Sequence, residues 1–196
     1  MAKNSTIILL AGILAFSWSC NFHQPDLKLS GTPQLHPELT PDLSPREKLV
    51  NTAIAEIGVQ EEGGNNRGKR IGEYLASTGL KQGHPWCAAF TKFVYDQNGL
   101  NTTGATAWSP TWFPKSRTYW TKGEDPESLQ QADIFGLHYK NLGRIGHVGL
   151  IEKVEDGWIY TIEGNTGSDQ VRDGDVVRRH RRSIKTISKI SNWIEP

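Results

Sequence analysis

The strongest constraint on the fold is a change of hydrophobic period near residue 132. From there onward, short runs of alternating apolar and polar residues are separated by two Asp-Gly pairs, Asp156-Gly157 and Asp173-Gly174. Asp-Gly favours the tight turns that connect neighbouring antiparallel strands. We therefore expect strands at 134–137, 146–154, 158–163, 175–180 and 187–193.

The segment before this change has the period of helices. Ser44 and Pro45, with Glu47 soon after, have the residue order of a helix start, and an apolar stripe follows over 49–57. Two further helices are expected, over 69–77 and from 86 or 87 to 97. Helices followed by an antiparallel sheet define the α+β class.

Residues 100–131 have no clear period but hold several aromatic side chains. We expect most of them to fill the core beneath a long connection, and the alternative is that they line a groove. The residues in question are Trp108, Trp112, Phe113, Tyr119 and Trp120.

The first 20 residues have the layout of a secretory signal. Lys3 precedes an apolar run at 7–16, and small and polar residues follow as far as Cys20. This run is too short to span a bilayer core of about 30 Å as a membrane helix. We expect an exported protein, in the cell envelope (periplasm or outer membrane, with a lipid anchor as one form) or secreted.

Cys20 stands at the position where bacterial lipoproteins are lipidated, and it would then tether the chain to a membrane. Ser17 departs from the usual residue of such signals, so lipidation stays open. Residues 21–45 contain half of the ten prolines and few apolar residues, which is typical of an extended tether. Residues 46–196 remain as one domain, which we expect to be monomeric.

Charge gives no indication of a nucleic-acid partner. Lys3 is the only charged residue of the first 20, so the rest of the chain holds 21 basic and 21 acidic residues. The basic run 178–182 is interpreted as a solvated strand face, with contact to an anionic wall or membrane as the alternative.

The sequence predicts neither a metal nor a cofactor. It contains no HExxH motif and no paired cysteines of a zinc site. Asp169, Asp173 and Asp175 resemble a loose Ca²⁺ cluster, but a polar hairpin turn is the preferred explanation.

Cys87 is the only cysteine of the expected domain. A buried, inert thiol is the ordinary alternative. At the start of a helix, however, a thiol faces the positive end of the helix dipole, which favours the thiolate, and its backbone N–H is free to bind an oxyanion. Cys87 is therefore the candidate nucleophile. Tyr74 and Gln82 are candidates for a second oxyanion donor, although a structural role explains each of them better.

Among the histidines, His147 is the best candidate for a base. It begins a well-patterned strand, and two nearby glycines permit close approach of another group. His23 and His36 lie in the tether, and His84 lies in the turn before Cys87. His180 lies among arginines, and His138 is near a strand but is not flanked by glycines as His147 is. The next strand ends in Glu163 and Asn165, which a hairpin places beside the start of the His147 strand. Either residue would fix the imidazole.

Four stretches, PWCAAFTKFVYDQNG, ADIFGL, GHVGLIEKV and IEGNTG, resemble the CHAP domains (cysteine, histidine-dependent amidohydrolases/peptidases), which belong with the papain-like cell-wall hydrolases. The resemblance covers most of residues 47–196. It is most specific at the family's Cys, His, Glu and Asn positions: Cys87, His147, Glu163 and Asn165. Ala132 replaces the glycine that usually precedes Asp133, which we interpret as a structural turn residue.

This resemblance implies a papain-like fold with the Cys87 helix packed on the antiparallel sheet. It also implies an enzyme that cleaves an amide bond of peptidoglycan through a cysteine acyl-enzyme, as an amidase at the sugar–peptide bond or as an endopeptidase. Peptidoglycan would then be the partner. The alternative is a non-catalytic wall-binding lipoprotein that retains the fold.

Overall fold

In this computed structural model, helices precede the sheet along the chain. The structure describes residues 42–125, 129–168 and 173–194, which lie in one unit, Pro41–Pro196. The expected signal segment 1–20 with Cys20, the tether up to residue 41, and Asp169 lie outside the described residues. Within the described part, no helix combines the length and apolar character needed to cross a membrane.

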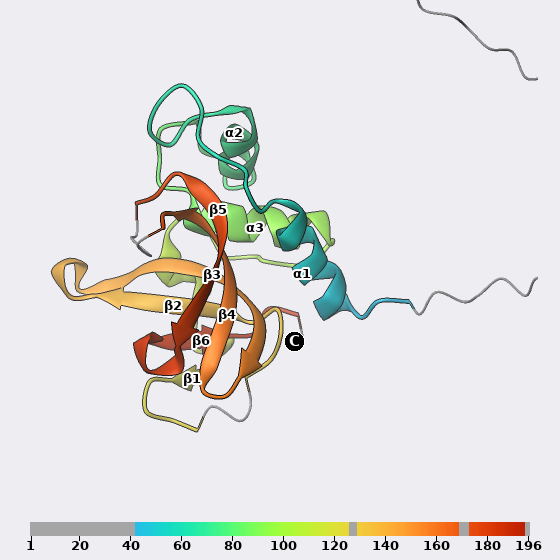
Figure 1. Cartoon of the computed structure of the whole chain (residues 1–196), viewed down its shortest axis with the longest axis vertical. Helices are drawn as coiled ribbons and strands as arrows, with labels where there is room; N and C mark the ends of the chain where they lie inside the picture. Colours follow the sequence, from blue (N-terminus) through green and yellow to red (C-terminus); the bar gives the residue numbers. More distant parts are fainter. Residues whose placement is uncertain (1–41, 126–128, 169–172, 195–196) are drawn as a thin grey trace, which may run out of the picture. The chain divides into compact units, whose positions relative to one another are not determined.

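Three α-helices and six strands are described (Figure 1). The helices are α1 (Pro45–Ala55), α2 (Lys69–Ala76) and α3 (Cys87–Gln97). The strands are β1 (Thr118–Thr121), β2 (Ile134–Tyr139), β3 (Arg144–Glu155), β4 (Trp158–Thr166), β5 (Val176–Ser183) and β6 (Lys189–Ser191).

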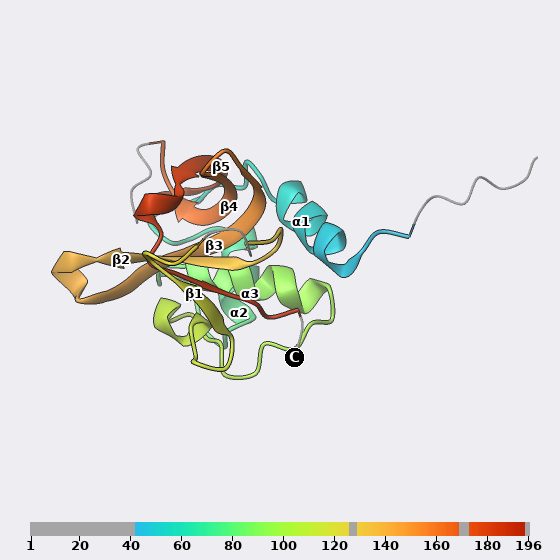
Figure 2. The same ribbon diagram turned by 90° about the horizontal axis from the view of Figure 1, so that it is seen from below.

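The six strands form one sheet in the order β1-β6-β2-β3-β4-β5, and every pairing is antiparallel. This confirms the α+β class and the antiparallel sheet. The long β2–β3 hairpin extends beyond the rest of the sheet (Figure 2). Strand β1 was not predicted, because four residues are too few to show a period.

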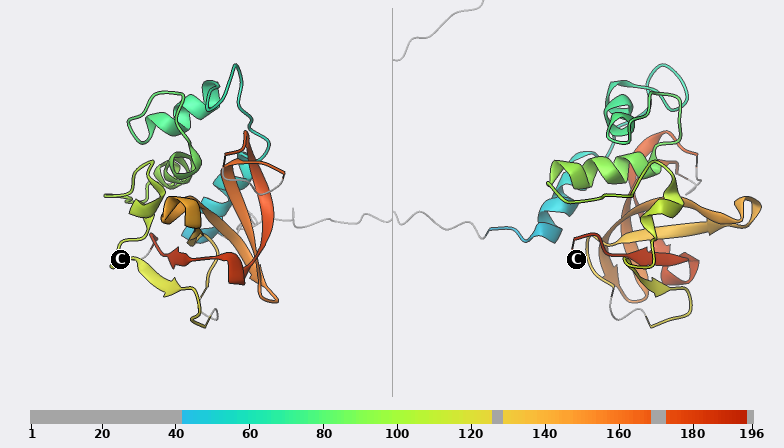
Figure 3. Two further views of the ribbon diagram at one scale, coloured as in Figure 1. Left: turned by 90° about the vertical axis from the view of Figure 1, so that its left-hand side faces the viewer. Right: turned by 180° about the vertical axis from the view of Figure 1, so that it is seen from behind.

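Helix α3 packs against β3 and β4, and α2 packs against α3. Figure 3 shows α3 between α2 and the strands. Phe90 and Val94 of α3 share the main core with Val148 of β3 and Ile162 of β4. The start of α3 is thereby held against the middle of the sheet.

Gly164 permits the close approach of β4 to the first turn of α3. A Cβ atom at this position would lie 2.7 Å from the Trp86 ring and 2.8 Å from Phe90. Such distances are far inside van der Waals contact, so only glycine fits without displacing the helix.

A buried aspartate joins α1 to the sheet. Asp133 accepts hydrogen bonds from Arg46 (3.0 Å), from the Gln130 amide (2.8 Å) and from the Tyr119 hydroxyl. Ala132 has a φ of 65°, a conformation that favours glycine. Asp133 thus has the structural role expected for it. Ala132 occupies a backbone position suited to the glycine that usually precedes this aspartate in CHAP domains.

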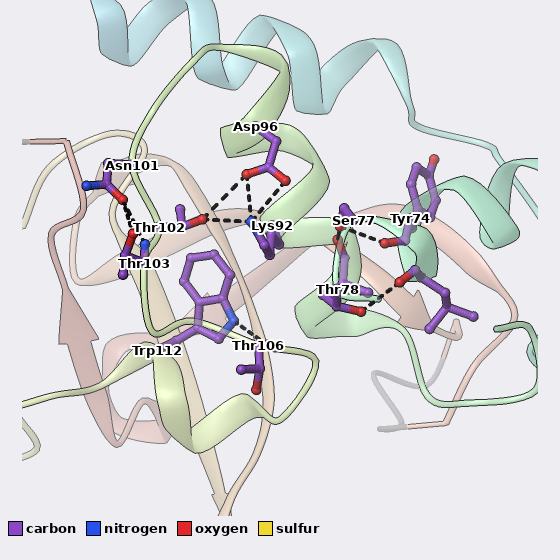
Figure 4. A network of polar contacts seen from close by, with 12 residues as sticks. Tyr74, Ser77, Thr78, Lys92, Asp96, Asn101, Thr102, Thr103, Thr106 and Trp112 are labelled. Atoms are coloured by element: carbon purple, nitrogen blue, oxygen red, sulfur yellow. Dashed lines mark hydrogen bonds and ion pairs between the residues drawn. The ribbon is translucent and has the colours of Figure 1, made fainter. Parts of the chain in front are cut away.

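Polar contacts fix the long connection after α3 (Figure 4). The Lys92 ammonium on α3 donates to Asp96 (2.8 Å) and to the Thr102 hydroxyl (3.0 Å), and the Trp112 indole donates to the Thr106 carbonyl (3.1 Å). These contacts hold the chain that leads into the short 3₁₀ helix η1 (Ser109–Trp112).

The aromatic residues of this connection divide between core and surface. Trp112, Phe113 and Trp120 are buried, which confirms the core interpretation for them. Trp108 is 56% exposed, so that interpretation is wrong for Trp108. Tyr119 is partly exposed while its hydroxyl binds Asp133. The residue before η1 therefore presents an aromatic ring to solvent.

We predict that Gly164→Ala destabilises the protein by about 1–3 kcal/mol, the usual cost of adding a methyl group to a filled core. Urea unfolding measures this loss of stability directly when the slope of the unfolding free energy against urea concentration is the same in both proteins. An unfolding midpoint equal to that of the wild type would contradict the close approach described for β4 and α3.

Candidate active site

Cys87 is the first residue of α3, as its sequence position indicated. Its side chain is only 4% exposed, but it lines a pocket of about 280 Å³ at the molecular surface. Among the described residues, none accepts a hydrogen bond from the Cys87 backbone N–H. This donor lies at the positive end of the helix dipole and is available to an oxyanion.

His147 and Glu163 form a buried pair on adjacent strands. His147 lies in β3 and Glu163 in β4, and both side chains are at most 1% exposed. The His147 Nε2 atom lies 2.8 Å from a Glu163 carboxylate oxygen. Because Nε2 is engaged in this way, Nδ1 is the ring nitrogen left for the thiol of Cys87.

The pKa values of Cys87 and His147 are shifted in opposite directions. Burial alone raises the pKa of the thiol, but the contact with His147 and its charge, with smaller contributions from Ser109 and the Val148 backbone, outweigh burial and lower it. Burial alone lowers the pKa of His147, but its interactions with Cys87 and Glu163 raise it to about 9. These directions favour a thiolate beside an imidazolium.

Glu163 is a fully buried carboxylate with a complete set of partners. Arg182 of β5 donates two hydrogen bonds to it (2.6 and 2.7 Å), and the Thr161 hydroxyl donates a third (2.5 Å). Burial alone would raise the pKa of Glu163, but Arg182 and His147 hold it well below its usual range. The carboxylate therefore stays charged and fixes the imidazole ring.

Arg182 was not foreseen as part of the site, because the basic run was interpreted as a solvated strand face. That interpretation holds for Arg179 and Arg181, which are exposed. It is wrong for His180 and Arg182, which are 7% and 6% exposed. The alternation of β5 places these two side chains on the inner face, and a period-2 reading of the run would have shown this.

Asn165 does not hold the imidazole in this structure. Its side-chain oxygen accepts a hydrogen bond from the Trp86 backbone N–H (3.0 Å), and its amide donates to the Gly174 carbonyl (2.6 Å). The expectation that Glu163 and Asn165 face the same side assumed a regular strand. Asn165 instead has a φ of 56°, and the β4–β5 register shifts after Glu163. It fixes the residue that precedes the Cys87 helix.

The glycine-rich loop 61–68 supports the same helix end. Glu61 accepts hydrogen bonds from the Trp86 indole (2.8 Å) and from the Asn66 amide (2.7 Å). The Asn165 amide in turn reaches the Asn66 side chain at 3.4 Å. This loop therefore positions Trp86 and the start of α3.

Ser109, like Arg182, is a site residue that sequence reasoning missed. Its hydroxyl lies 3.7 Å from the Cys87 sulfur, within hydrogen-bonding range for sulfur, and no local pattern indicated this approach. Neither suggested oxyanion donor lines the pocket beside Cys87. Tyr74 donates to Glu56, and Gln82 accepts from the Gly68 amide (3.1 Å), so both have structural roles.

Among the residues that the structure describes, no cluster of three or more His, Cys, Asp or Glu side chains is arranged to hold a metal ion. Asp169, a member of the loose carboxylate cluster seen in the sequence, lies outside those residues.

The helix that begins at Cys87 packs on an antiparallel sheet, so the site lies in a fold of the α+β class. Residues 79–165 match the family model of the CHAP domain. No curated protein matches the chain.

The solved structures similar to the chain include the following three. One is an NlpC/P60 family protein from Bacillus cereus ATCC 10987, with 19% identity and a TM-score of 0.44. The second is the peptidoglycan hydrolase RipB from Mycobacterium tuberculosis, with 13% identity and a TM-score of 0.43. The third is a protein described as similar to lipoprotein, NLP/P60 family, from Staphylococcus aureus subsp. aureus Mu50, with 14% identity and a TM-score of 0.40. The matches cover 76%, 78% and 79% of this chain, but only 40%, 66% and 43% of those chains.

We predict that Arg182→Met destabilises the protein by about 3–5 kcal/mol, because it leaves the buried Glu163 carboxylate without its main partner. Arg179→Met is the matched control. Arg179 lies on β5, as Arg182 does, and forms a two-bond pair with Glu152 of β3. Because Arg179 is exposed, its loss should cost at most about 1 kcal/mol. Equal costs in urea unfolding would contradict the role given to Arg182.

We also predict that Ser109→Ala raises the pKa of the Cys87 thiol, because it removes one of the contacts that favour the thiolate. The pH dependence of iodoacetamide alkylation reports this pKa. Ser77→Ala removes a hydroxyl that donates to the Tyr74 carbonyl instead, and should leave the profile unchanged. If the alkylation rate of Ser109→Ala rises with pH at the same pH as in the wild type, the Ser109 hydroxyl does not act on the thiol.

Proposed function

We propose that the chain is a peptidoglycan hydrolase that cleaves an amide bond through a cysteine acyl-enzyme. The observation that carries this proposal is the contact between His147 and the buried, Arg182-bound Glu163, with the thiol of Cys87 coupled to the same imidazole. The CHAP match supports the substrate class.

In the proposed mechanism, the Cys87 thiolate attacks the carbonyl carbon of the amide. The carbonyl oxygen becomes an oxyanion, which the backbone N–H of Cys87 stabilises. His147, as imidazolium, transfers the proton on Nδ1 to the leaving nitrogen, and the amine departs. The product of this half-reaction is a thioester between the acyl group and Cys87.

The neutral His147 then takes a proton from water, which attacks the thioester carbonyl. Collapse of the second oxyanion releases the carboxylic acid product and returns the thiolate–imidazolium pair. Glu163 remains ionised throughout, because Arg182 balances its charge. We assign Glu163, rather than Asn165, as the residue that orients the imidazole.

The proposed location follows from this substrate, because peptidoglycan lies outside the cytoplasmic membrane. Residues 1–20 would direct export, and residues 46–196 would be the catalytic unit. A tether through Cys20 is compatible with this arrangement and is not required by it. A non-catalytic wall-binding lipoprotein is less well supported, since binding alone gives no reason for a buried ion pair beside a thiol.

Digestion of purified peptidoglycan sacculi tests the proposal. Residues 21–196 should release soluble fragments, and the fragment masses identify the bond as sugar–peptide or peptide–peptide. Cys87→Ala should lower the release by about 10³-fold or more while the protein stays folded, because the nucleophile is absent. Equal release by both proteins would exclude a cysteine mechanism. Release by neither would favour the wall-binding alternative.

We predict that hydrolysis declines as pH rises through about 9, where His147 loses the proton that it must donate. Glu163→Gln removes one of the interactions that raise this pKa, so the decline should move to lower pH. Thr161→Val is the control, because it removes a hydrogen bond to Glu163 but retains the charge beside His147. A decline at the same pH in wild type and Glu163→Gln would exclude this role of Glu163.

A further inference from the structure

The pocket that Cys87 lines has a distinctive set of charges. Its lining contains one arginine, Arg144, and one histidine, His84, but no aspartate or glutamate. Gly146 and Ser109 complete the wall near the thiol. The fixed charge at this wall of the pocket is therefore positive.

Arg144 has no carboxylate partner among the described residues. Its only hydrogen bond there runs from one terminal nitrogen to the neighbouring Ile145 carbonyl, at 2.8 Å. A guanidinium carries five N–H donors in a planar fork, so most of them remain available. Other arginines of the sheet, such as Arg179 and Arg182, are paired with glutamates.

Trp108 restricts where this guanidinium can lie. The Arg144 guanidinium carbon is 5.8 Å from the centroid of the Trp108 ring, and both residues line the pocket. The hydrogen bonds of Figure 4 hold the connection that leads to Trp108. A guanidinium held beside an aromatic ring loses less freedom when it binds an anion, because it is already partly ordered.

We propose that Arg144, beside the Trp108 ring, is a binding site for a carboxylate of the substrate, placed beside the amide bond that Cys87 attacks. This inference rests on the proposed function for its substrate, but the anion site itself is testable without turnover. The substrate class it names is a stem peptide with a free carboxylate near the scissile bond.

Electrostatics favour such a site for an anionic substrate. The attacking group is a thiolate, which repels a carboxylate brought near it. A guanidinium that lines the pocket offsets this repulsion and can bind the carboxylate through two parallel N–H bonds. A substrate with a carboxamide in that position gains neither benefit, so the pocket discriminates between the two forms.

Two alkylating reagents test the anion site directly. Iodoacetate and iodoacetamide have the same leaving group and similar size, but only the first carries a carboxylate. Both reactions depend equally on the fraction of Cys87 that is thiolate. This fraction therefore cancels in the ratio of the two rate constants. Arg144→Gln should lower this ratio about tenfold, the lower end of the contribution of a charge-assisted hydrogen bond.

Arg181→Gln is the matched control. Arg181 also lies beside a tryptophan ring, with its guanidinium carbon 4.0 Å from the centroid of the Trp158 ring, but it does not line the pocket. Its loss should leave the ratio unchanged. Equal ratios in wild type and Arg144→Gln, or an equal decrease in both variants, would overturn the proposal.

A panel of soluble muramoyl peptides then identifies the carboxylate that Arg144 binds. In each member of the panel, one free carboxylate is converted to a carboxamide. The wild type should cleave one member at least tenfold more slowly than the parent, and Arg144→Gln should cleave both at similar rates. If the wild type cleaves every member equally, the anion site fails while the hydrolase stands. If no member is cleaved but the alkylation ratio responds to Arg144, the hydrolase fails while the anion site stands.

Discussion

The buried carboxylate of Glu163 is the group on which the rest of the site depends. A charge without access to water is tolerated only when it is paired and hydrogen-bonded, and here Arg182, His147 and Thr161 supply the partners. The same pairing that makes this charge stable also holds the imidazole ring and favours its protonated form. Stability and the proposed chemistry therefore rest on one set of contacts, which joins β3, β4 and β5.

The second requirement is that the start of α3 meets this set of contacts. Gly164 allows β4 to approach the helix, and Asn165 binds the backbone of Trp86, one residue before the nucleophile. Glu61 fixes the Trp86 indole from the other side. The thiol is thus positioned through its neighbours in the chain and on β4. Asn165 belongs to the site through this positioning rather than through contact with His147.

Local patterns were sufficient to predict the helices, the Asp156-Gly157 hairpin, and Cys87 at a helix start. They placed His147 on a strand but not at its correct position, because β3 begins at Arg144 and His147 is its fourth residue. They failed where tertiary structure decides. The left-handed Asn165 breaks the alternation that seemed to place it beside Glu163. Ser109 reaches the thiol from a connection without any period, and nothing in the basic run names Glu163 as the partner of Arg182.

The central claim is that Cys87 and His147 exist as a thiolate–imidazolium pair at neutral pH. Proton–nitrogen correlation spectra of the ¹⁵N-labelled imidazole side chains, recorded at pH 7 and assigned with a His147→Gln variant, measure the protonation of each ring nitrogen. The account predicts that both nitrogens of His147 carry a proton, as its raised pKa requires. A neutral ring with a single protonated nitrogen at that pH would contradict it.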